Sequence, residues 1–373
     1  MSSQPIDLET LVRSKFNVRD SFQLQDGEME FTVDYRPDSR DRFVELFGVL
    51  AASGYTPRLT GSADEAVLYV RKAQPLAKRR SRVPLTLALL AFGSVGAFGL
   101  LLMGIYSQYA PSVPGLTVIL LYGAAVLGVL AAHELGHVIV ARRRGEVGLT
   151  PYPLPGIPGI TGALATLGIV SRQRGPALNR DRLYDVILAG PLFGLVLSLL
   201  IYVSGAFVSV QSAVPLQSCQ LTSNGTGTLC PSVIQIGLDA VVGPFLPSVS
   251  PGYSALSPLA DGATVGFILT FASLIPLASF DGGYLSGLAW GSVASRVASY
   301  VSVLLLIMLD VPDYWGLAVA ALLLMNLSRS FGPQLLDEVS PTSNGRRWVY
   351  LLLLLVALLC MPVPHSFLGY SLG

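Results

Sequence analysis

Five consecutive residues, His133-Glu134-Leu135-Gly136-His137, combine side chains that can do chemistry. In a helix, residues at i and i+4 share one face, so the two imidazoles could hold one Zn²⁺ ion. Glu134 would lie beside that metal and polarise water, which zinc acidifies to a pKa of about 7. Gly136 would leave room for another backbone. The pattern predicts a catalytic zinc site with Glu134 as general base.

The sequence around this motif favours a functional role for its residues over a structural one. The chain has three histidines, and two of them stand here, within the apolar stretch AAVLGVLAAHELGHVIVA. Ionisable side chains inside a membrane helix cost free energy and mostly serve a function. The alternative is a pair of buried polar side chains that satisfy each other.

A catalytic zinc site needs a third protein ligand and keeps one position open. His365 falls in the C-terminal tail, so this ligand should be Asp, Glu or Cys. Asp281, in Phe280-Asp281-Gly282-Gly283, follows an apolar run whose end should lie at the depth of the two motif histidines. Taken alone, Asp281 could simply end a helix before two glycines. Three other aspartates remain as alternatives: Asp185, Asp261 and Asp310.

The amino-acid composition indicates the class of fold that must hold these residues in place. Hydrophobic residues make up 52% of the 373 residues and charged residues only 13%, against about 25% in soluble domains. We therefore expect a predominantly α-helical, polytopic membrane protein with six to seven spans. Seven apolar runs are candidates: 84–106, 115–141, 183–208, 258–280, 297–310, 314–328 and 348–362. With a net charge of +1 and no basic tract interleaved with aromatic residues, nucleic-acid binding is not expected.

Lys and Arg are distributed unevenly between the loops. Beyond Arg82, the segments 107–114, 209–257, 311–313 and 363–373 contain neither residue, whereas the alternate segments contain all of them. Positively charged loops stay in the cytoplasm. We therefore expect the N-terminal domain and the active-site end on the cytoplasmic side, or the stromal side in a plastid, and the C-terminus on the opposite side.

The first 75 residues form a small soluble α+β domain in this interpretation. Residues 28–35 alternate as a half-buried strand does, residues 41–52 have helical spacing, and residues 66–70 form a second strand. A basic linker at 76–83 follows, then a catalytic membrane core at 84–300 and C-terminal membrane helices and a tail at 301–373. Residues 1–30 have no apolar signal-peptide region, so membrane insertion should begin after Val83.

Residues 148–170 are apolar but broken by four prolines and several glycines, including Gly159 and Gly162. Such backbone is tolerated at membrane depth only inside protein or beside a cavity. The segment could offer a strand edge to an extended substrate, with Gly159 and Gly162 in contact with it, or it could lie on the membrane surface.

Two of the three cysteines, Cys219 and Cys230, share one loop on the predicted outer side. Oxidising conditions there would allow a disulfide, and the alternative is two unpaired thiols. Cys360 lies in an apolar run and is expected to serve packing.

Several motifs together resemble the site-2 protease family of intramembrane zinc metalloproteases, and in particular its archaeal and plastid greening-related branch. The motifs are HELGH, the Pro/Gly-rich segment after it, Arg182-Leu183-Tyr184-Asp185-Val186 before Ala189-Gly190-Pro191, Ser257-Pro258-Leu259, and Leu274-Ile275-Pro276 before Phe280-Asp281-Gly282-Gly283. The likeness covers roughly residues 84–300.

This resemblance implies Zn²⁺ held by His133, His137 and Asp281, with Glu134 as general base. It implies hydrolysis of a peptide bond within or near a transmembrane segment of a membrane-protein substrate. Where the family has Asn and Leu, this chain has Ser273 and Phe280. The family Asn is thought to engage the substrate, so Ser273 and Pro276 are candidate substrate-binding residues.

Two other classes of protein share some of these features. A zinc-binding scaffold without turnover would keep the ligands, and the change to Ser273 leaves that alternative open. A transporter would also bury charge and break helices, but the sequence has no internal repeat and no second set of mid-membrane charges.

Overall fold

The fold is seen in a computed structural model. The structure describes residues 7–24, 27–73, 81–158, 160–161, 164–208, 210–215, 231–245, 253–308, 312–327 and 333–363.

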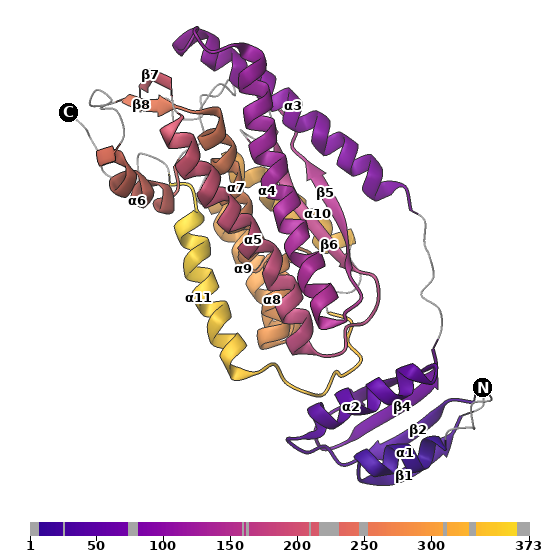
Figure 1. Cartoon of the computed structure of the whole chain (residues 1–373). Helices are drawn as coiled ribbons and strands as arrows, with labels where there is room; N and C mark the ends of the chain where they lie inside the picture. Colours follow the sequence, from indigo (N-terminus) through magenta and orange to yellow (C-terminus); the bar gives the residue numbers. More distant parts are fainter. Residues whose placement is uncertain are drawn as a thin grey trace.

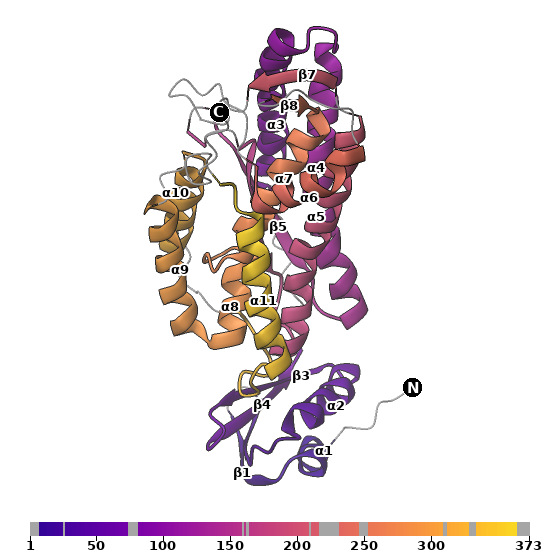
Figure 2. The same ribbon diagram turned by 90° about the vertical axis from the view of Figure 1, so that its left-hand side faces the viewer.

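The N-terminal region is a small α+β domain with two helices on one face of a sheet (Figure 2). The sheet is antiparallel, with the strand order β1-β2-β4-β3. Its elements are α1 (Leu8–Lys15), β1 (Val18–Gln23), β2 (Met29–Val33), α2 (Ser39–Ala52), β3 (Tyr55–Gly61) and β4 (Ala66–Lys72). Phe31 and Leu68 of the sheet pack against Phe43 and Leu46 of α2 in the core.

The predicted β-α-β unit covers three of these elements, β2, α2 and β4, and misses α1, β1 and β3. Strand β1 is missed because it is an edge strand without regular alternation of buried residues. In β3, Pro57 and Gly61 are residues that normally argue against a strand. Pairing with neighbouring strands outweighs these local preferences.

Three helices are long and apolar enough to cross a membrane: α3 (Val83–Tyr109), α4 (Gly115–Arg144) and α5 (Arg180–Phe207). Among the described residues, six shorter helices follow: α6 (Val233–Val242), α7 (Pro258–Leu274), α8 (Asp281–Trp290), α9 (Ser292–Met308), α10 (Pro312–Leu327) and α11 (Asn344–Cys360). Helix α7 packs against α4 and α5 in the middle of the bundle (Figure 1), and every residue from Gly262 to Leu274 is buried. The protein is thus predominantly helical, while six to seven spans remain a prediction.

The predicted span 258–280 is divided in two. Helix α7 ends at Leu274, and α8 begins at Asp281. Pro276 disfavours helical backbone at Ile275, whose ψ is 150°. Ser279 has a φ of 73°, which an L-residue rarely adopts in a helix. The break makes Asp281 the first residue of a helix, where the sequence suggested the last residue of a span.

The Pro/Gly-rich segment is a β-hairpin. Strands β5 (Leu149–Pro155) and β6 (Thr166–Gln173) pair antiparallel, with Pro151 opposite Ser171 and Pro153 opposite Ile169. Helix α3 packs along β5, and Ser94 of α3 is within hydrogen-bond distance of the carbonyl oxygens of Gly156 (2.6 Å) and Ala165 (2.8 Å). The hairpin therefore lies inside the protein, as the sequence requires of broken backbone at membrane depth.

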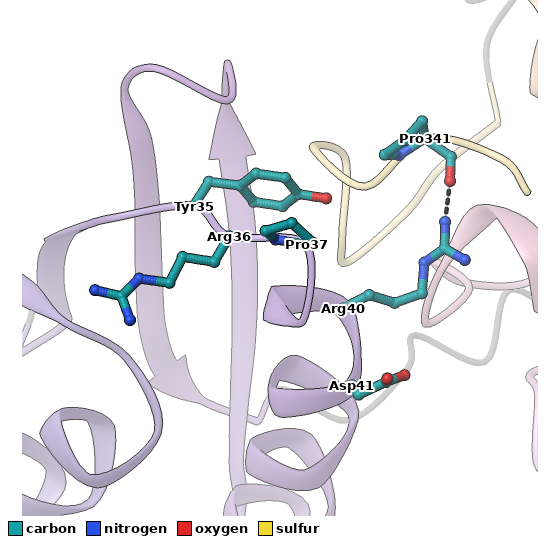
Figure 3. A pocket seen from close by; sticks show the side chains of 6 residues that line it. All are labelled: Tyr35, Arg36, Pro37, Arg40, Asp41 and Pro341. Atoms are coloured by element: carbon teal, nitrogen blue, oxygen red, sulfur yellow. Dashed lines mark hydrogen bonds between the residues drawn. The ribbon is translucent and has the colours of Figure 1, made fainter.

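Residues 335–338 connect the N-terminal domain to the helical part. The Leu59 N–H of β3 donates to the Leu336 carbonyl (2.7 Å), and the Leu336 N–H donates to the Ala177 carbonyl (2.8 Å). Arg40 of α2 pairs with Asp181 of α5 at 2.7 Å and also donates to the Pro341 carbonyl (Figure 3). The two parts are thus joined by backbone hydrogen bonds as well as by ion pairs.

A second hairpin, β7 (Val210–Pro215) and β8 (Tyr253–Leu256), lies at the other end of the bundle (Figure 1). Cys219 and Cys230 lie outside the described residues, so their disulfide stays a prediction. Cys360 is a free, buried thiol at the end of α11, which fits the expected role in packing.

Candidate metal centre

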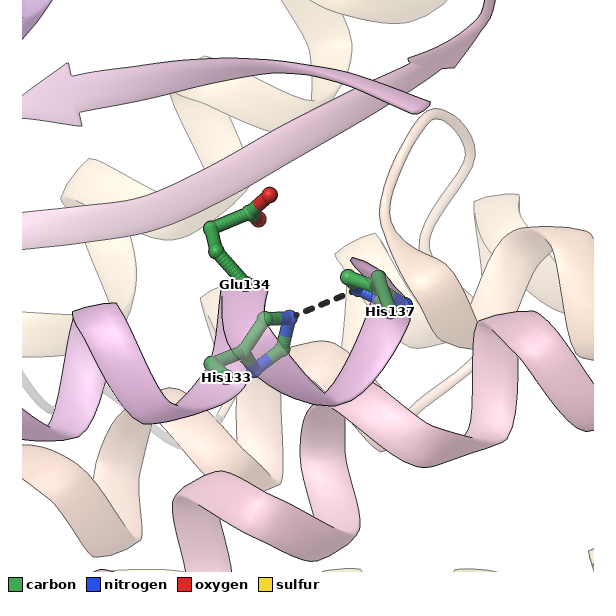
Figure 4. A group of neighbouring side chains, drawn as sticks. All are labelled: His133, Glu134 and His137. Carbon is green, nitrogen blue, oxygen red and sulfur yellow. Dashed lines mark hydrogen bonds between the residues drawn. The ribbon is translucent and has the colours of Figure 1, made fainter. Parts of the chain in front are cut away.

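Helix α4 presents His133 and His137 on one face, as their spacing predicts (Figure 4). Their Nε2 atoms are 3.2 Å apart, and both side chains are buried. Helix α4 continues past them to Arg144 and ends where Gly145 adopts a left-handed φ of 66°. The histidines thus stand about two turns before the end of the helix, in regular backbone that fixes their direction.

Asp281 reaches the same point from α8. Its Oδ2 atom is 2.9 Å from Nε2 of His133 and 3.6 Å from Nε2 of His137. The break before α8 allows this approach because the chain turns at Pro276–Phe280 instead of continuing along α7. Three side chains from two helices, separated by more than a hundred residues in sequence, therefore converge.

The chemistry of this donor set fits a zinc ion. Ligand bonds of about 2.0–2.1 Å in a tetrahedral site separate neighbouring ligand atoms by about 3.3 Å. The three distances of 2.9, 3.2 and 3.6 Å lie around that value. Asp281 is only 1% exposed, and apart from the two imidazoles its carboxylate oxygens have no hydrogen-bond donor among the described residues. A buried carboxylate without donors needs a cation.

Helix α5 orients His137. Nδ1 of His137 is 2.8 Å from the Val186 carbonyl, which can only accept, so Nδ1 carries the proton. Nε2 of the neutral ring is then left with a free lone pair, as metal binding requires. Gly190 lies one turn further along α5, where a Cβ atom would overlap His137 Nε2 and crowd His133 Nε2. A glycine at this position makes the space for the imidazoles.

Glu134 lies on the side of α4 that faces the hairpin (Figure 4). Ser171 of β6 donates a hydrogen bond to Glu134 Oε1 at 3.2 Å. The ligand atoms of Glu134, His133 and His137 all lie within 4.8 Å of one another, so Glu134 could also be a ligand. The buried Asp281 carboxylate, 2.9 and 3.6 Å from the two Nε2 atoms, favours Asp281 as the third ligand, and Glu134 lies beside this group.

The other predicted residues lie as follows. Gly136 permits close packing of α4 on α5, because a Cβ atom there would overlap the Ala189 carbonyl, and that prediction is confirmed. Ser273 is buried and lines a small cavity together with His133 and Thr270. Pro276 lies in the break before α8 and is partly exposed. Gly159 and Gly162 lie outside the described residues.

The alternative third ligands are engaged elsewhere or outside the described residues. Asp185 forms ion pairs with Arg144 and Arg346. Asp261 accepts a hydrogen bond from Tyr106, and about 18 Å of helix separates it from Ser273. Asp310 lies outside the described residues. Of the three aspartates that the structure describes, Asp281 is the one that lies beside the histidines.

Three contributions to the site were not predicted from the sequence. They are the Val186 carbonyl, the small size of Gly190 and the hydroxyl of Ser171. A glycine directly before Pro191 within a long apolar helix was a signal for Gly190, since glycine costs helix stability. A backbone carbonyl and one serine among many carry no such signal.

Comparisons with known proteins identify the family of this chain. The model of Peptidase family M50 matches residues 122–309, which is half of the chain and includes both motif histidines and Asp281. No solved structure matches the chain.

Among curated proteins, the chain is similar to two plant chloroplast proteins. It is 27% identical over 315 residues to "Probable zinc metalloprotease EGY2, chloroplastic" of Arabidopsis thaliana, covering 78% of this chain and 52% of the relative. It is 28% identical over 258 residues to "Probable zinc metalloprotease EGY1, chloroplastic" of the same plant, covering 65% and 42%. The chain thus spans about half the length of these relatives. The motifs, the donor set and the family match lead to one conclusion: this chain belongs to Peptidase family M50, the site-2 proteases.

Proposed function

We propose that this chain is a zinc metallopeptidase that hydrolyses a peptide bond within or near a transmembrane segment of a membrane-protein substrate. The observation that carries the proposal is the convergence of His133, His137 and Asp281 beside Glu134, inside a bundle of apolar helices. A site buried among apolar helices suits a transmembrane segment, which itself lies in an apolar medium.

His133, His137 and Asp281 would hold the metal, and Glu134 would act as general base. Zinc, when bound, supplies Lewis acidity that acidifies water and polarises a carbonyl. Glu134 accepts the proton of the attacking water and passes it to the leaving amine. The Val186 carbonyl keeps His137 in the tautomer that leaves Nε2 free. The same donor set supports zinc over Mg²⁺ or Ca²⁺, which prefer oxygen ligands.

Strand β6 would bind the substrate, because the two edges of the hairpin differ. Pro151 and Pro153 of β5 have no N–H, and alternate residues of a strand point to the same edge. The residues between them must therefore bond to β6, and the prolines leave the outer edge of β5 without donors. Helix α3 also packs along β5.

The opposite edge, on β6, keeps its donors. Ser171 and Ile169 stand directly opposite the two prolines, so their N–H and C=O groups also point out of the hairpin. Among the described residues, no backbone hydrogen bond joins either one to a third strand. Buried backbone groups normally have partners. An extended substrate segment pairing with this edge would supply them and would pass beside Glu134 and His133.

The substrate helix must unwind to pair in this way, since a helical segment has its backbone groups already bonded. Ser273 and Pro276 would contact the unwound segment from the α7 side, and Gly159 and Gly162 from the tip of the hairpin. N-methylation of alternate amides in a substrate peptide should raise KM if the backbone of β6 forms these bonds, and an unchanged KM would contradict the pairing.

The proposed topology puts the N-terminal domain and the ends of α4 and α8 that carry the site on the cytoplasmic or stromal side. It is supported by the three arginines that end α4, Arg142–Arg144, close to the site. The proposed division of the chain is a soluble domain at 1–75, a linker at 76–83, a catalytic core at 84–300 and a C-terminal region at 301–373.

Glu134→Gln tests the function directly. The variant should keep stoichiometric zinc, because the ligands are untouched, and should cleave a model transmembrane peptide at least about a hundredfold more slowly. Glu45→Gln, at an exposed position of α2, is the matched control and should cleave at the normal rate. Cleavage that persists in Glu134→Gln would exclude the proposed role. Zinc without cleavage in the unmodified protein would favour the scaffold alternative, and absence of zinc would favour a transporter.

A further inference from the structure

One hydroxyl group connects the substrate-binding strand to the proposed base. Ser171 is only 1% exposed, and its Oγ atom donates to Glu134 Oε1 at 3.2 Å. This is the one hydrogen bond that the Glu134 carboxylate has among the described residues. Ser171 itself has no other side-chain partner there, so the contact is specific to this pair.

A general base needs a defined direction as well as a suitable proton affinity. The carboxylate of Glu134 lies at the end of three rotatable bonds, and α4 fixes only the first atoms of the side chain. Hydrogen bonds at catalytic groups are often long before substrate binds and tighten afterwards. At 3.2 Å the Ser171–Glu134 contact is longer than the usual O–H···O range of about 2.5–3.0 Å, and the proposal below requires it to shorten when substrate binds.

The position of Ser171 is set by the hairpin and not by α4. Ser171 stands opposite Pro151 in the β5–β6 ladder. Two residues later, the side-chain amide of Gln173 bonds twice to the backbone of Gln334, at 3.0 and 2.8 Å. At the other end of β6, Thr166 donates to the Leu154 carbonyl at 2.7 Å. Strand β6 is thus held at both ends, and Ser171 offers its hydroxyl from a fixed point.

The same residue belongs to the edge proposed to pair with substrate. Its backbone groups point out of the hairpin, while its side chain reaches Glu134. A substrate segment bonded to that edge would therefore be held in register with the base through a single residue.

We propose that Ser171 is a positioning residue that holds the Glu134 carboxylate toward the substrate bound on β6. The proposal rests on the proposed peptidase function. It assigns Ser171 no contact with the metal, so it predicts a loss of turnover without a loss of zinc.

The test compares Ser171→Ala with Ser171→Thr in the full-length protein, using a peptide of one transmembrane segment as substrate. Ser171→Ala should lower kcat on the order of tenfold, the effect expected for one hydrogen bond to a charged group. Its KM should change less than about twofold, because the backbone edge is intact. Zinc content should stay at the normal level. Ser171→Thr keeps the hydroxyl and should recover most of kcat.

Two further variants separate positioning from folding. Ser299→Ala removes a fully buried hydroxyl of α9 that bonds only within its own helix, and it should leave kcat unchanged. In Glu134→Asp the carboxylate is drawn back from Ser171, so adding Ser171→Ala to that variant should have little further effect. If threonine does not fit at position 171, the double variant still tests the positioning role.

The possible failures are distinguishable. If the unmodified protein does not cleave, the peptidase function itself fails. If it cleaves and Ser171→Ala matches it in kcat, or if Ser171→Ala loses zinc, or if its effect is the same in the Glu134→Asp background, the positioning role is wrong.

Discussion

Two aspartates, Asp261 and Asp281, lie within the same apolar bundle, and their carboxylates differ in their hydrogen-bond partners. At one end of α7, Asp261 accepts a hydrogen bond from the fully buried Tyr106 at 2.9 Å. Beside it, Gln235 of α6 donates to Thr264 and accepts from the Ser232 N–H. Beyond the other end, Asp281 faces two imidazole nitrogens, and apart from these its oxygens have no hydrogen-bond donor among the described residues.

This difference distinguishes a carboxylate that stabilises the structure from a carboxylate that is available to bind a ligand. Polar groups that satisfy each other hold helices together and need nothing more. A buried carboxylate without donors is costly unless a cation joins it. By sequence alone Asp281 was the first candidate for the third zinc ligand and Asp261 was an alternative. Their hydrogen bonds decide between them.

The strongest test of this contrast exchanges each aspartate for asparagine. Asp281→Asn should weaken zinc binding by about a hundredfold or more, because it removes a charged ligand. Asp261→Asn should keep normal zinc, since its amide oxygen can still accept from Tyr106. Metal content after dialysis against a graded chelator measures both. Loss of zinc from Asp261→Asn alone would reverse the assignment.

A second test fills the space around the imidazoles. A methyl group at Gly190 would overlap His137 Nε2, so Gly190→Ala should displace the ring and lower zinc content, at a cost of about 1–3 kcal/mol in stability. On α4, a Cβ at Gly128 would meet only Leu197, at 3.9 Å. Gly128→Ala should therefore bind zinc normally and unfold at an equal or slightly higher temperature. Equal zinc in both variants would show that the space at Gly190 is not needed.

A third test removes the hydrogen bond between Tyr106 and Asp261. Tyr106→Phe leaves Asp261 without its donor and should lower the free energy of unfolding by about 1–3 kcal/mol. Zinc content and cleavage should be unchanged, because the site lies at the other end of α7. Thermal unfolding in detergent measures the loss. A Tyr106→Phe protein that is as stable as the original but inactive would mean that the two ends are coupled.

The smallest expected effect is that of replacing Glu146, just after α4. In its hydrogen bonding this carboxylate is intermediate between Asp261 and Asp281. Its Oε2 atom accepts from the Leu178 N–H at 3.1 Å, while the buried Oε1 has no hydrogen bond among the described residues and lies 3.9 Å from the Arg182 guanidinium. Burial raises its pKa above the usual 4.5, and the Leu178 hydrogen bond and the Arg182 charge only partly oppose this. Because the folded pKa is the higher one, this group favours the folded state below about pH 4.5, and its contribution is lost as pH rises through the folded pKa.

Glu146→Gln should remove that part of the pH dependence. The unfolding temperature of the original protein, relative to the variant, should fall as pH rises from about 4.5 through the folded pKa. Parallel curves for the two proteins would contradict the raised pKa.

The common face of the two histidines and the long helices could be predicted because they follow from short-range rules. The spacing of His133 and His137 fixes their common face, and apolar runs identify the long helices. Asp281 was harder, since its approach depends on the break at Pro276 and on a residue with positive φ, Ser279. The sequence placed Asp281 at the end of a span, whereas it begins α8, and its role as a zinc ligand stays a prediction.

What could not be predicted depends on contacts distant in sequence. Ser171 meets Glu134 because the packing of the hairpin brings β6 beside α4, which lies far from it in sequence. Edge strand β1 has no periodicity of its own, and it is stabilised by pairing with β2. In each case tertiary pairing supplies what local preference does not.

Residues 335–338 change what counts as the N-terminal folding unit. Leu178 and Leu336 lie in the same buried cluster as Phe31 and Phe43. A fragment that ends at residue 75 would therefore lack part of its own interior and would expose the edge of β3 that now bonds to Leu336 and Glu338. The core of the small N-terminal domain therefore includes residues from two later parts of the chain. These residues, Leu178 and Leu336, are synthesised long after the domain itself, and Leu336 follows most of the apolar helices.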